Sequence, residues 1–415
     1  MATAKASIED QVQTLMRGVE YGDANLHRTM EQELRERLAE GRPLRVYAGF
    51  DPTSTDLHLG NLVPMLKMRQ FQKLGHEVTF LIGTMTGIVG DPSDKTAARR
   101  MLTMDEVEAN AETWLGQAFR VLDPSLTLIK RNGDWLSPLN FKDVVDLASK
   151  FTVSQFLDRE NFQLRLKESK PIYVHEFLYA LMQGYDAVVM RTDVQIGGTD
   201  QLFNIIAGRT LQREHGQKPQ VAICLPILTG TDGHLKMSKS TGNYIGMDDE
   251  PADMYGKVMS IPDSLILDYF TLLTEVPGEE LGRVSDGLQE GGSSAMEAKK
   301  RLAREIVGLL HSPTSAVLAQ QEFERVFQRR EAPEESAIDL AVDLGPSGEA
   351  EIDVTQALSQ AGVVASRGEA RRLVTQGGIA VDGKTLTEAR VTLRVGSLIR
   401  VGRHRFLRVV AGPVR

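Results

Sequence analysis

Short apolar runs alternate with amphipathic stretches between residues 44 and 228. LRVYAGF, EVTFLIG, LTLIKR and VAICLPIL have the composition of buried strands, whereas LVPMLKMRQFQKLG and DQLFNIIAGRTLQREHG have a helical periodicity. Such alternation predicts an α/β fold with a Rossmann-like parallel sheet and with ligands at the carboxyl ends of its strands. Residues 250–330 have a helical pattern throughout, which predicts an α-helical domain after the sheet.

Composition excludes several classes of protein. The chain of 415 residues is 41% hydrophobic and 25% charged, so it can bury the cores of two or three domains. Its single cysteine, Cys224, excludes an intrachain disulfide and a cysteine-rich metal site, and its apolar neighbours favour a buried strand position over a nucleophile. No apolar run is long enough to span a membrane, and the charged N-terminus lacks the apolar core of a secretory signal. We therefore expect a cytoplasmic protein that does not contact membranes.

The net charge of −8 is unevenly distributed along the chain. Residues 352–415 carry 11 Lys and Arg against 4 Asp and Glu, whereas the rest of the chain is acidic. An acidic stretch at residues 331–351 predicts a linker before this basic module. A basic module on an acidic body is typical of nucleic-acid binding, and a solvated basic surface is the alternative.

Two segments are suited to phosphate chemistry. YAGFDPTSTDLHLGN combines a strand, a turn and a helix start, the layout that directs backbone N–H groups at phosphate, and it places His58 at the helix start. HLKMSKSTGN places Lys236 and Lys239 on a polar loop, and two ammonium groups suit pyrophosphate. The chain has no G-x-G-x-x-G, and GIVGDPSDKT is not a Walker loop because Asp94 stands where that loop requires glycine. The alternatives are an ordinary helix start and a solvated basic loop.

One predicted helix presents polar side chains that suit an amino acid with a phenol. YALMQGYD places Tyr179, Gln183 and Asp186 at i, i+4 and i+7, on one helix face. Asp186 and the Tyr47 hydroxyl are suited to a phenolic hydroxyl. Asp91, together with Tyr179 and Gln183, is suited to an ammonium group. A capped, half-buried helix is the alternative for each residue alone, but an isolated buried carboxylate is costly, which favours the pocket.

Together, HLGN and KMSKS resemble the paired signatures of the class I aminoacyl-tRNA synthetases. YAGFDPTSTDLHLGN, GIVGDPS, YALMQGYD and QIGGTDQ resemble the bacterial-type tyrosyl-tRNA synthetases. The resemblance implies a ligase that forms tyrosyl-adenylate from L-tyrosine and ATP, releases pyrophosphate, and transfers tyrosine to the 3′ end of tRNA(Tyr). It also implies a homodimer. Mg²⁺ would arrive with ATP, and no metal site built by the protein is expected.

The resemblance divides the chain into four parts. It implies a class I catalytic domain at residues 1–245 and a helical, anticodon-side domain at residues 246–330. The acidic linker at residues 331–351 follows. Residues 352–415 resemble the small α+β RNA-binding domain shared with a ribosomal small-subunit protein, the alpha-L fold.

The resemblance also assigns roles to individual residues. Catalysis is assigned to Thr53, His58, Lys95, Arg99, Lys236 and Lys239. ATP binding is assigned to Asp51, His58, Gly60, Asn61, Gly198, Asp200, Lys236 and Lys239. Tyrosine binding is assigned to Tyr47, Asp91, Tyr179, Gln183, Asp186, Gln195 and Gln201. RNA binding is assigned to Arg367, Arg371, Arg372, Arg403 and Arg405.

The chain departs from the family pattern at three positions. Asn61 replaces a second histidine, Asp94 a glycine and Leu202 a tryptophan, which affects the expected ATP contacts and the loop after Asp94 but not the reaction. Three other classes stay open: a tryptophanyl-tRNA synthetase-like ligase, a nucleotidylyltransferase with a similar His-x-Gly motif, and a non-catalytic RNA-binding relative. Asp186 facing Tyr47 favours a phenol over an indole. The presence of both KMSKS lysines argues against a non-catalytic protein.

Overall fold

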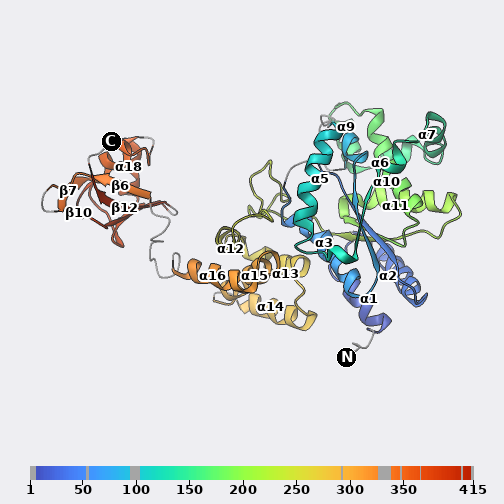
Figure 1. Cartoon of the computed structure of the whole chain (residues 1–415), viewed down its shortest axis with the longest axis horizontal. Helices are drawn as coiled ribbons and strands as arrows, with labels where there is room; N and C mark the ends of the chain where they lie inside the picture. Colours follow the sequence, from blue (N-terminus) through green and yellow to red (C-terminus); the bar gives the residue numbers. More distant parts are fainter. Residues whose placement is uncertain are drawn as a thin grey trace. The chain divides into compact units, whose positions relative to one another are not determined.

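The computed structural model describes residues 6–52, 56–93, 103–290, 293–325, 338–345, 348–364, 366–402 and 405–412. The chain divides into two compact units, Met1–Ala316 and Val317–Arg415 (Figure 1). Within the described residues, no helix is both long and apolar enough to cross a membrane. The domain boundaries expected from the sequence, at residues 245, 330 and 351, remain predictions.

The first unit contains a five-stranded sheet in which all neighbouring strands are parallel. The strands lie in the order β3-β2-β1-β4-β5. Their bounds are β1 Arg45–Phe50, β2 Glu77–Ile82, β3 Thr127–Arg131, β4 Val194–Gly198 and β5 Val221–Leu225. The chain builds from β1 outward to β3, then returns to add β4 on the other side of β1. This arrangement confirms the expected Rossmann-like sheet, and the reversal of strand order places a ligand crevice at the carboxyl ends of β1 and β4.

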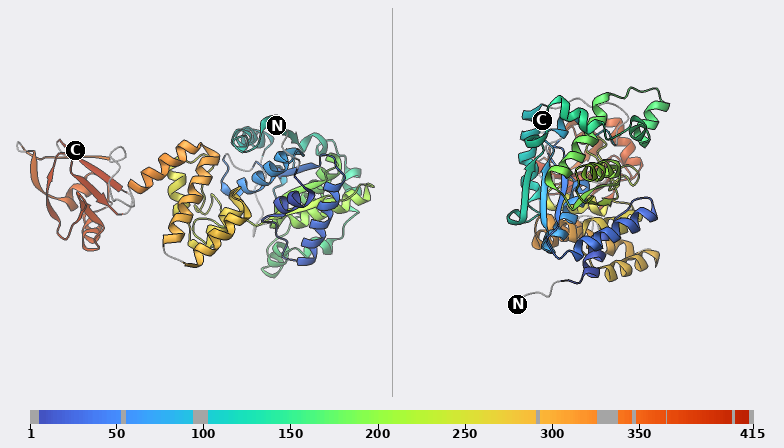
Figure 2. Two further views of the ribbon diagram at one scale, coloured as in Figure 1. Left: turned by 90° about the horizontal axis from the view of Figure 1, so that it is seen from below. Right: turned by 90° about the vertical axis from the view of Figure 1, so that its right-hand side faces the viewer.

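Helices pack against this sheet (Figures 1 and 2). α3 contacts β1, β2 and β4, whereas α11 packs along α10 and contacts β4 and β5. Several of these helices begin at a side chain that caps their first N–H groups, such as Asp23 before α2 and Thr103 before α5. The bounds are α1 Ile8–Met16, α2 Ala24–Ala39, α3 Leu59–Lys73, α4 Thr86–Val89, α5 Met104–Ala118, η1 Pro124–Leu126, α6 Gly133–Leu136, α7 Phe141–Ala148, α8 Val153–Leu157, α9 Glu160–Lys167, α10 Val174–Met190, η2 Thr199–Gln201 and α11 Leu202–Glu214.

Helices α12 to α16 follow the sheet in the chain. Their bounds are α12 Pro251–Met259, η3 Asp263–Leu265, α13 Ile266–Leu273, α14 Gly278–Glu290, α15 Ser293–Leu310 and α16 Pro313–Phe323. α15 packs against α12, α13 and α14 (Figure 1). α13 also packs against α3. Apolar side chains such as Phe270 and Ile306 are fully buried between these helices. The segment is therefore helical, as its sequence pattern predicted.

The second unit is an α+β domain with its own apolar core. Its main sheet has the order β6-β12-β11-β8-β9, and β10 pairs with β7 in a separate ladder. The core includes Leu358, Leu393 and Ile399, all fully buried. The bounds are β6 Ile338–Val342, β7 Glu349–Asp353, α17 Val354–Gln360, α18 Arg367–Thr375, β8 Ile379–Val381, β9 Lys384–Thr385, β10 Arg390–Arg394, β11 Leu398–Val401 and β12 Arg405–Ala411. This unit is the small C-terminal α+β domain expected from the sequence.

Part of the stretch expected as an acidic linker forms strands in this unit. β6 lies within residues 331–351 and pairs in parallel with β12 along its length, and β7 starts within it. In IDLAV the alternation buries Leu340 and Val342, while Asp339 on the other face pairs with Arg408. The acidic composition of residues 331–351 therefore predicted a linker where an apolar residue at every second position of IDLAV indicates a strand. Residues 331–337 lie outside the described part of the chain.

A buried carboxylate joins the two central strands at their amino ends. Asp193, just before β4, is 1% exposed and accepts hydrogen bonds from the Arg45 N–H of β1 (2.9 Å), from Arg42 (2.7 Å) and from Arg37 of α2 (3.0 Å). Burial alone would raise the pKa of the Asp193 carboxyl. Hydrogen bonds from Arg42 and Arg45 outweigh this effect and hold the pKa well below its ordinary value. An ionised Asp193 thus ties α2, β1 and β4 together.

Asp193→Asn should lower the free energy of unfolding by about 3–5 kcal/mol at pH 7, because it leaves the buried Arg37 guanidinium without its nearest counter-charge. Urea unfolding measures the loss, and Asp146→Asn, an exposed acid paired with Lys150, is the matched control with little expected effect. The folded pKa of Asp193 is below the unfolded value of about 3.9, so its stabilising contribution is complete above that pH and is lost as the pH falls further. The difference in the free energy of unfolding between the wild-type protein and Asp193→Asn should therefore become smaller below about pH 4. Equal stabilities at pH 7 would contradict this role.

Candidate active site

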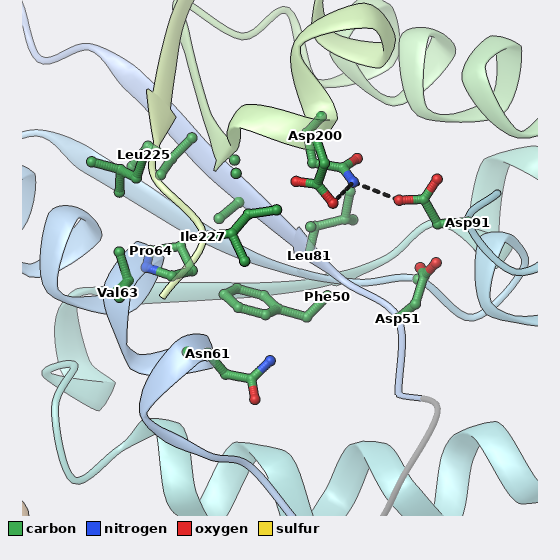
Figure 3. A pocket seen from close by; sticks show the side chains of 18 of the residues that line it. Phe50, Asp51, Asn61, Val63, Pro64, Leu81, Asp91, Asp200, Leu225 and Ile227 are labelled. Atoms are coloured by element: carbon green, nitrogen blue, oxygen red, sulfur yellow. Dashed lines mark hydrogen bonds between the residues drawn. The ribbon is translucent and has the colours of Figure 1, made fainter. Parts of the chain in front are cut away.

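A cavity of about 710 Å³ opens at the carboxyl ends of the central strands (Figure 3). Its walls come from β1, β2, β4, the start of α3, α10 and the segment at residues 236–240. Every described residue to which the sequence assigned ATP or tyrosine lines it: Tyr47, Asp51, His58, Gly60, Asn61, Asp91, Tyr179, Gln183, Asp186, Gln195, Gly198, Asp200, Gln201, Lys236 and Lys239. Thr53, Lys95 and Arg99 lie outside the described residues.

The start of α3 presents a neutral imidazole to this cavity. His58 is the N-cap of α3, and its Nδ1 accepts the Gly60 N–H (3.1 Å), while the Asn61 side chain accepts the His58 N–H (3.1 Å). A Cβ at residue 60 would lie 2.9 Å from the His58 ring, so the turn requires glycine there. Burial, followed by the charges of Lys239 and Lys236, lowers the pKa of His58 to about 4. With Nδ1 accepting, the proton of the neutral ring is on Nε2, which can donate to a ligand oxygen.

The two signature segments are joined through their backbones. The Leu59 N–H donates to the Ile245 carbonyl (3.0 Å), and the Met247 N–H donates to the Leu57 carbonyl (2.9 Å). These bonds form a short antiparallel bridge between His58 and Gly246. We call this contact the HLGN–KMSKS bridge, because it links the turn at residues 57–59 to the chain that follows KMSKS.

At the deep end of the cavity, a carboxylate faces an unsatisfied hydroxyl. Asp186 is 1% exposed and accepts hydrogen bonds from Trp135 Nε1 (2.8 Å) and Asn132 Nδ2 (3.2 Å). The Tyr47 hydroxyl is fully buried and has no hydrogen-bond partner among the residues that the structure describes. Burial raises the pKa of Asp186 to about 8, although the two hydrogen bonds oppose it, and burial together with Asp186 raises the pKa of Tyr47 well above its ordinary value. A buried hydroxyl without a partner is costly, so this end fits a ligand that brings a polar group.

A second group of polar side chains lies toward the mouth. Asp91 accepts a hydrogen bond from Gln201, beside Asp200 (Figure 3). The Tyr179 hydroxyl donates to Asp51 (2.8 Å), which also accepts from Thr86 (2.7 Å). Asp51, assigned to ATP from the sequence, therefore supports Tyr179 in this structure.

The remaining wall is formed by β4 and the loop at residues 236–240. A Cβ at Gly198 would lie 2.4 Å from an Asp200 oxygen, so a larger residue there would displace this carboxylate. Burial, with Asp91, raises the pKa of Asp200, while burial lowers the pKa of Lys236. Lys239 forms an ion pair with Asp56 (3.0 Å). Both lysines face the cavity that His58 faces, which gathers cationic groups at one end.

Sequence reasoning missed the residues that hold Asp186. Asn132 donates to Asp186 and to the Thr86 hydroxyl (2.8 Å), and its side-chain oxygen accepts the Met85 N–H (2.9 Å). Asn132 and Trp135 follow β3 directly, in RNGDW. Polar residues at the carboxyl end of a strand in a parallel sheet were the available signal.

The arginines assigned to RNA lie in the second unit. Arg371 and Arg372 are exposed on α18, whereas Arg367 at its first turn pairs with Asp353 (2.6 Å). Arg405 begins β12 and donates to the Val363 carbonyl. Arg403 lies outside the described residues. No group of three or more His, Cys, Asp or Glu that could hold a metal occurs among the residues the structure describes.

A doubly wound parallel sheet with HLGN and KMSKS at its carboxyl edge is typical of class I aminoacyl-tRNA synthetases. The family described as "tRNA synthetases class I (W and Y)" matches residues 39–328, and the S4 domain family matches residues 356–399. The tyrosine–tRNA ligase of Moorella thermoacetica is 45% identical over 97% of both chains, and that of Aquifex aeolicus is 46% identical over 92% of this chain and 95% of its own. The chain therefore belongs to the tyrosine–tRNA ligase family.

Solved structures show the same fold at lower identity. A C-terminally truncated mitochondrial tyrosyl-tRNA synthetase of Aspergillus nidulans aligns with a TM-score of 0.62 at 22% identity, covering 77% of this chain and 94% of its own. The tyrosyl-tRNA synthetase of Archaeoglobus fulgidus, complexed with L-tyrosine, aligns with a TM-score of 0.59 at 22% identity, covering 76% of this chain and all of its own.

The contact between Trp135 and Asp186 predicts an optical titration. Because burial raises the pKa of Asp186, the indole emission should change with a midpoint near pH 8 as the carboxyl ionises. Trp135→Phe should abolish this change, whereas Trp114→Phe, at the chain's other tryptophan, should keep it. Asn132→Ala should raise the midpoint by about one pH unit, because it removes a hydrogen bond that favours the ionised form. A midpoint that Asn132→Ala leaves unchanged would contradict the assignment.

Proposed function

We infer that the chain is a tyrosine–tRNA ligase. The carboxylate of L-tyrosine attacks the α-phosphorus of ATP, forming tyrosyl-adenylate and displacing pyrophosphate. A hydroxyl at the 3′ end of tRNA(Tyr) then attacks the tyrosyl carbonyl and releases AMP. The observation that carries this inference is the buried pair of Asp186 and the partnerless Tyr47 hydroxyl, in a cavity whose other end carries His58 and two lysines.

The phenolic hydroxyl of the substrate fits between Asp186 and Tyr47. It exchanges hydrogen bonds with the Asp186 carboxyl group and with the Tyr47 hydroxyl, which satisfies both buried groups. We propose that Asp91 and Gln183 bind the ammonium group, with Tyr179 held in place by Asp51. Gln195 and Gln201 complete the amino acid site in this proposal.

Positioning and electrostatics supply the catalysis in this proposal, because the attacking carboxylate belongs to the substrate. His58 Nε2 donates to a phosphate oxygen, while Lys236 and Lys239 bind the charge that develops on the departing pyrophosphate. Thr53, Lys95 and Arg99 are proposed from the sequence to assist there. The nucleotide lies against Gly60, Asn61, Gly198 and Asp200. Mg²⁺ would enter with ATP.

We propose that the second unit binds the tRNA. The S4 family match at residues 356–399 and the basic charge of residues 352–415 support an RNA-binding role. Arg371 and Arg372 are exposed on α18. Arg367 is the first residue of that helix, and Arg405 is the first residue of β12. Arg403 joins them from the sequence. Supply of charged tRNA for translation would place the protein in the cytoplasm.

We also propose a homodimer. A set of exposed apolar side chains occurs in α7 to α10 and their connections: Phe141, Val145, Val153, Leu164, Leu166, Tyr173 and Val174. Phe141 and Val174 are 83% and 77% exposed, and such a concentration of exposed apolar groups is typical of an interface. A symmetric interface over this segment would bury them in both copies.

Val174→Asp should convert the protein to a species with the mass of one chain in light scattering, because a carboxylate would be buried at the interface. Leu128→Asp, at an exposed apolar residue of β3, should leave a mass of two chains. A wild-type protein with the mass of a single chain at micromolar concentration would contradict the dimer.

ATP–pyrophosphate exchange across the twenty amino acids tests the function, and tyrosine alone should support rapid exchange. Asp186→Ala should lower the ratio of kcat/KM for tyrosine over phenylalanine by at least about tenfold, because only tyrosine loses its hydrogen bond to the buried Asp186 carboxyl group. Gln183→Ala, at the ammonium end, should weaken both amino acids equally. Exchange with tryptophan instead of tyrosine, or an unchanged ratio in Asp186→Ala, would overturn the assignment.

A further inference from the structure

Asp56 contacts a residue of the proposed phosphate site without being part of that site. Its carboxylate lies 3.0 Å from Lys239 Nζ, as a hydrogen-bonded ion pair. Lys239 lines the cavity, whereas Asp56 is not among the lining residues. The pair therefore sits at the rim, with its ammonium group facing both the cavity and the carboxylate.

The backbone on the Asp56 side of this pair is held firmly. The next residue, Leu57, donates its N–H to Gln117 Oε1 (2.7 Å) and belongs to the HLGN–KMSKS bridge. Gln117 is buried and also donates to Asp248. Asp56 is thus attached to a hydrogen-bonded segment of backbone that leads directly to His58.

The backbone on the Lys239 side is folded by one asparagine. Asn243 accepts the Ser238 N–H (2.9 Å) and donates to Asp232 (2.8 Å), and the Gly242 N–H donates to the Lys239 carbonyl (3.1 Å). These bonds hold the Lys239 backbone, whereas the Lys239 side chain is a flexible four-carbon stem. Rotation of that side chain can move the ammonium group from Asp56 to a ligand in the cavity.

We propose that Asp56 is a positioning residue that holds Lys239 at the rim and competes with the phosphates of ATP and with pyrophosphate for its ammonium group. This inference rests on the proposed function, because it requires a polyphosphate in the cavity. Binding of the polyphosphate exchanges one anionic partner of Lys239 for another, and no covalent step is involved. Asp56 therefore lowers the affinity for polyphosphate while holding the Lys239 ammonium group beside the cavity.

Asp56→Asn removes the competing charge and keeps the side-chain volume. The variant should raise kcat/KM for ATP in tyrosine-dependent exchange, and the affinity for pyrophosphate, by about two- to fivefold, the range that an exposed ion pair supplies. Higher ionic strength should shrink this gain, because exposed pairs are screened. Glu250→Gln removes an exposed carboxylate at the start of α12, away from Lys239, and should leave both parameters unchanged.

The effect must depend on Lys239. In a Lys239→Gln background, Asp56→Asn should not raise kcat/KM for ATP, because the ammonium group for which Asp56 and the phosphates compete is absent. The same gain in both backgrounds would show that Asp56 repels phosphate directly and would overturn the proposal, as would a fall in kcat/KM for ATP in Asp56→Asn. Wild-type protein without tyrosine-dependent exchange would instead refute the proposed function itself. Asp56→Ser, which also removes the charge, guards against a folding defect specific to asparagine.

Discussion

The pairing of β1 with β4 determines most of what the first unit can do, and the buried Asp193 fixes that pairing. Arg45 donates its backbone N–H to Asp193 at the amino ends of the two strands, and Tyr47 and Gln195 face each other two residues further along. Two residues of strand span about 6.6 Å, so the ion cluster and the floor of the cavity are adjacent. A slip of one residue would turn Tyr47 to the other face of the sheet.

The cavity contains one basic and one acidic group whose pKa values are shifted in opposite directions. The depressed pKa of His58 and the raised pKa of Asp186 share one cause, burial, which disfavours the charged form of either group. The buried Tyr47 hydroxyl, which has no hydrogen-bond partner among the described residues, adds a further cost in folding free energy. These groups destabilise the free protein relative to an apolar core, and a ligand that satisfies them recovers that free energy as affinity. Asp193, in the same sheet, is also buried, but its hydrogen bonds from arginines lower its pKa and keep it ionised.

The sequence predicted the sheet, the helical segment, the C-terminal domain and the residues that line the cavity, because these depend on short-range periodicity and on contiguous motifs. It missed Asn132 and Trp135, since their contact with Asp186 spans about fifty residues and no local pattern encodes it. The hydrogen bond from Tyr179 to Asp51 was not predicted either, because the partner of a side chain depends on the register of distant strands. Roles at Thr53, Lys95 and Arg99 stay predictions, as do the domain boundaries.

The HLGN–KMSKS bridge has a consequence for how this protein varies. Its bonds join backbone N–H groups to backbone carbonyls, between segments almost two hundred residues apart, and such bonds are indifferent to side-chain identity. The relative placement of the two segments is thus decoupled from the residues they display. A second histidine can become Asn61, and a polar residue such as Asp56 can arise beside it, without moving His58 relative to the loop that carries Lys239. Backbone hydrogen bonds set the position of HLGN relative to KMSKS, so side chains around the phosphate site can be substituted without changing that position.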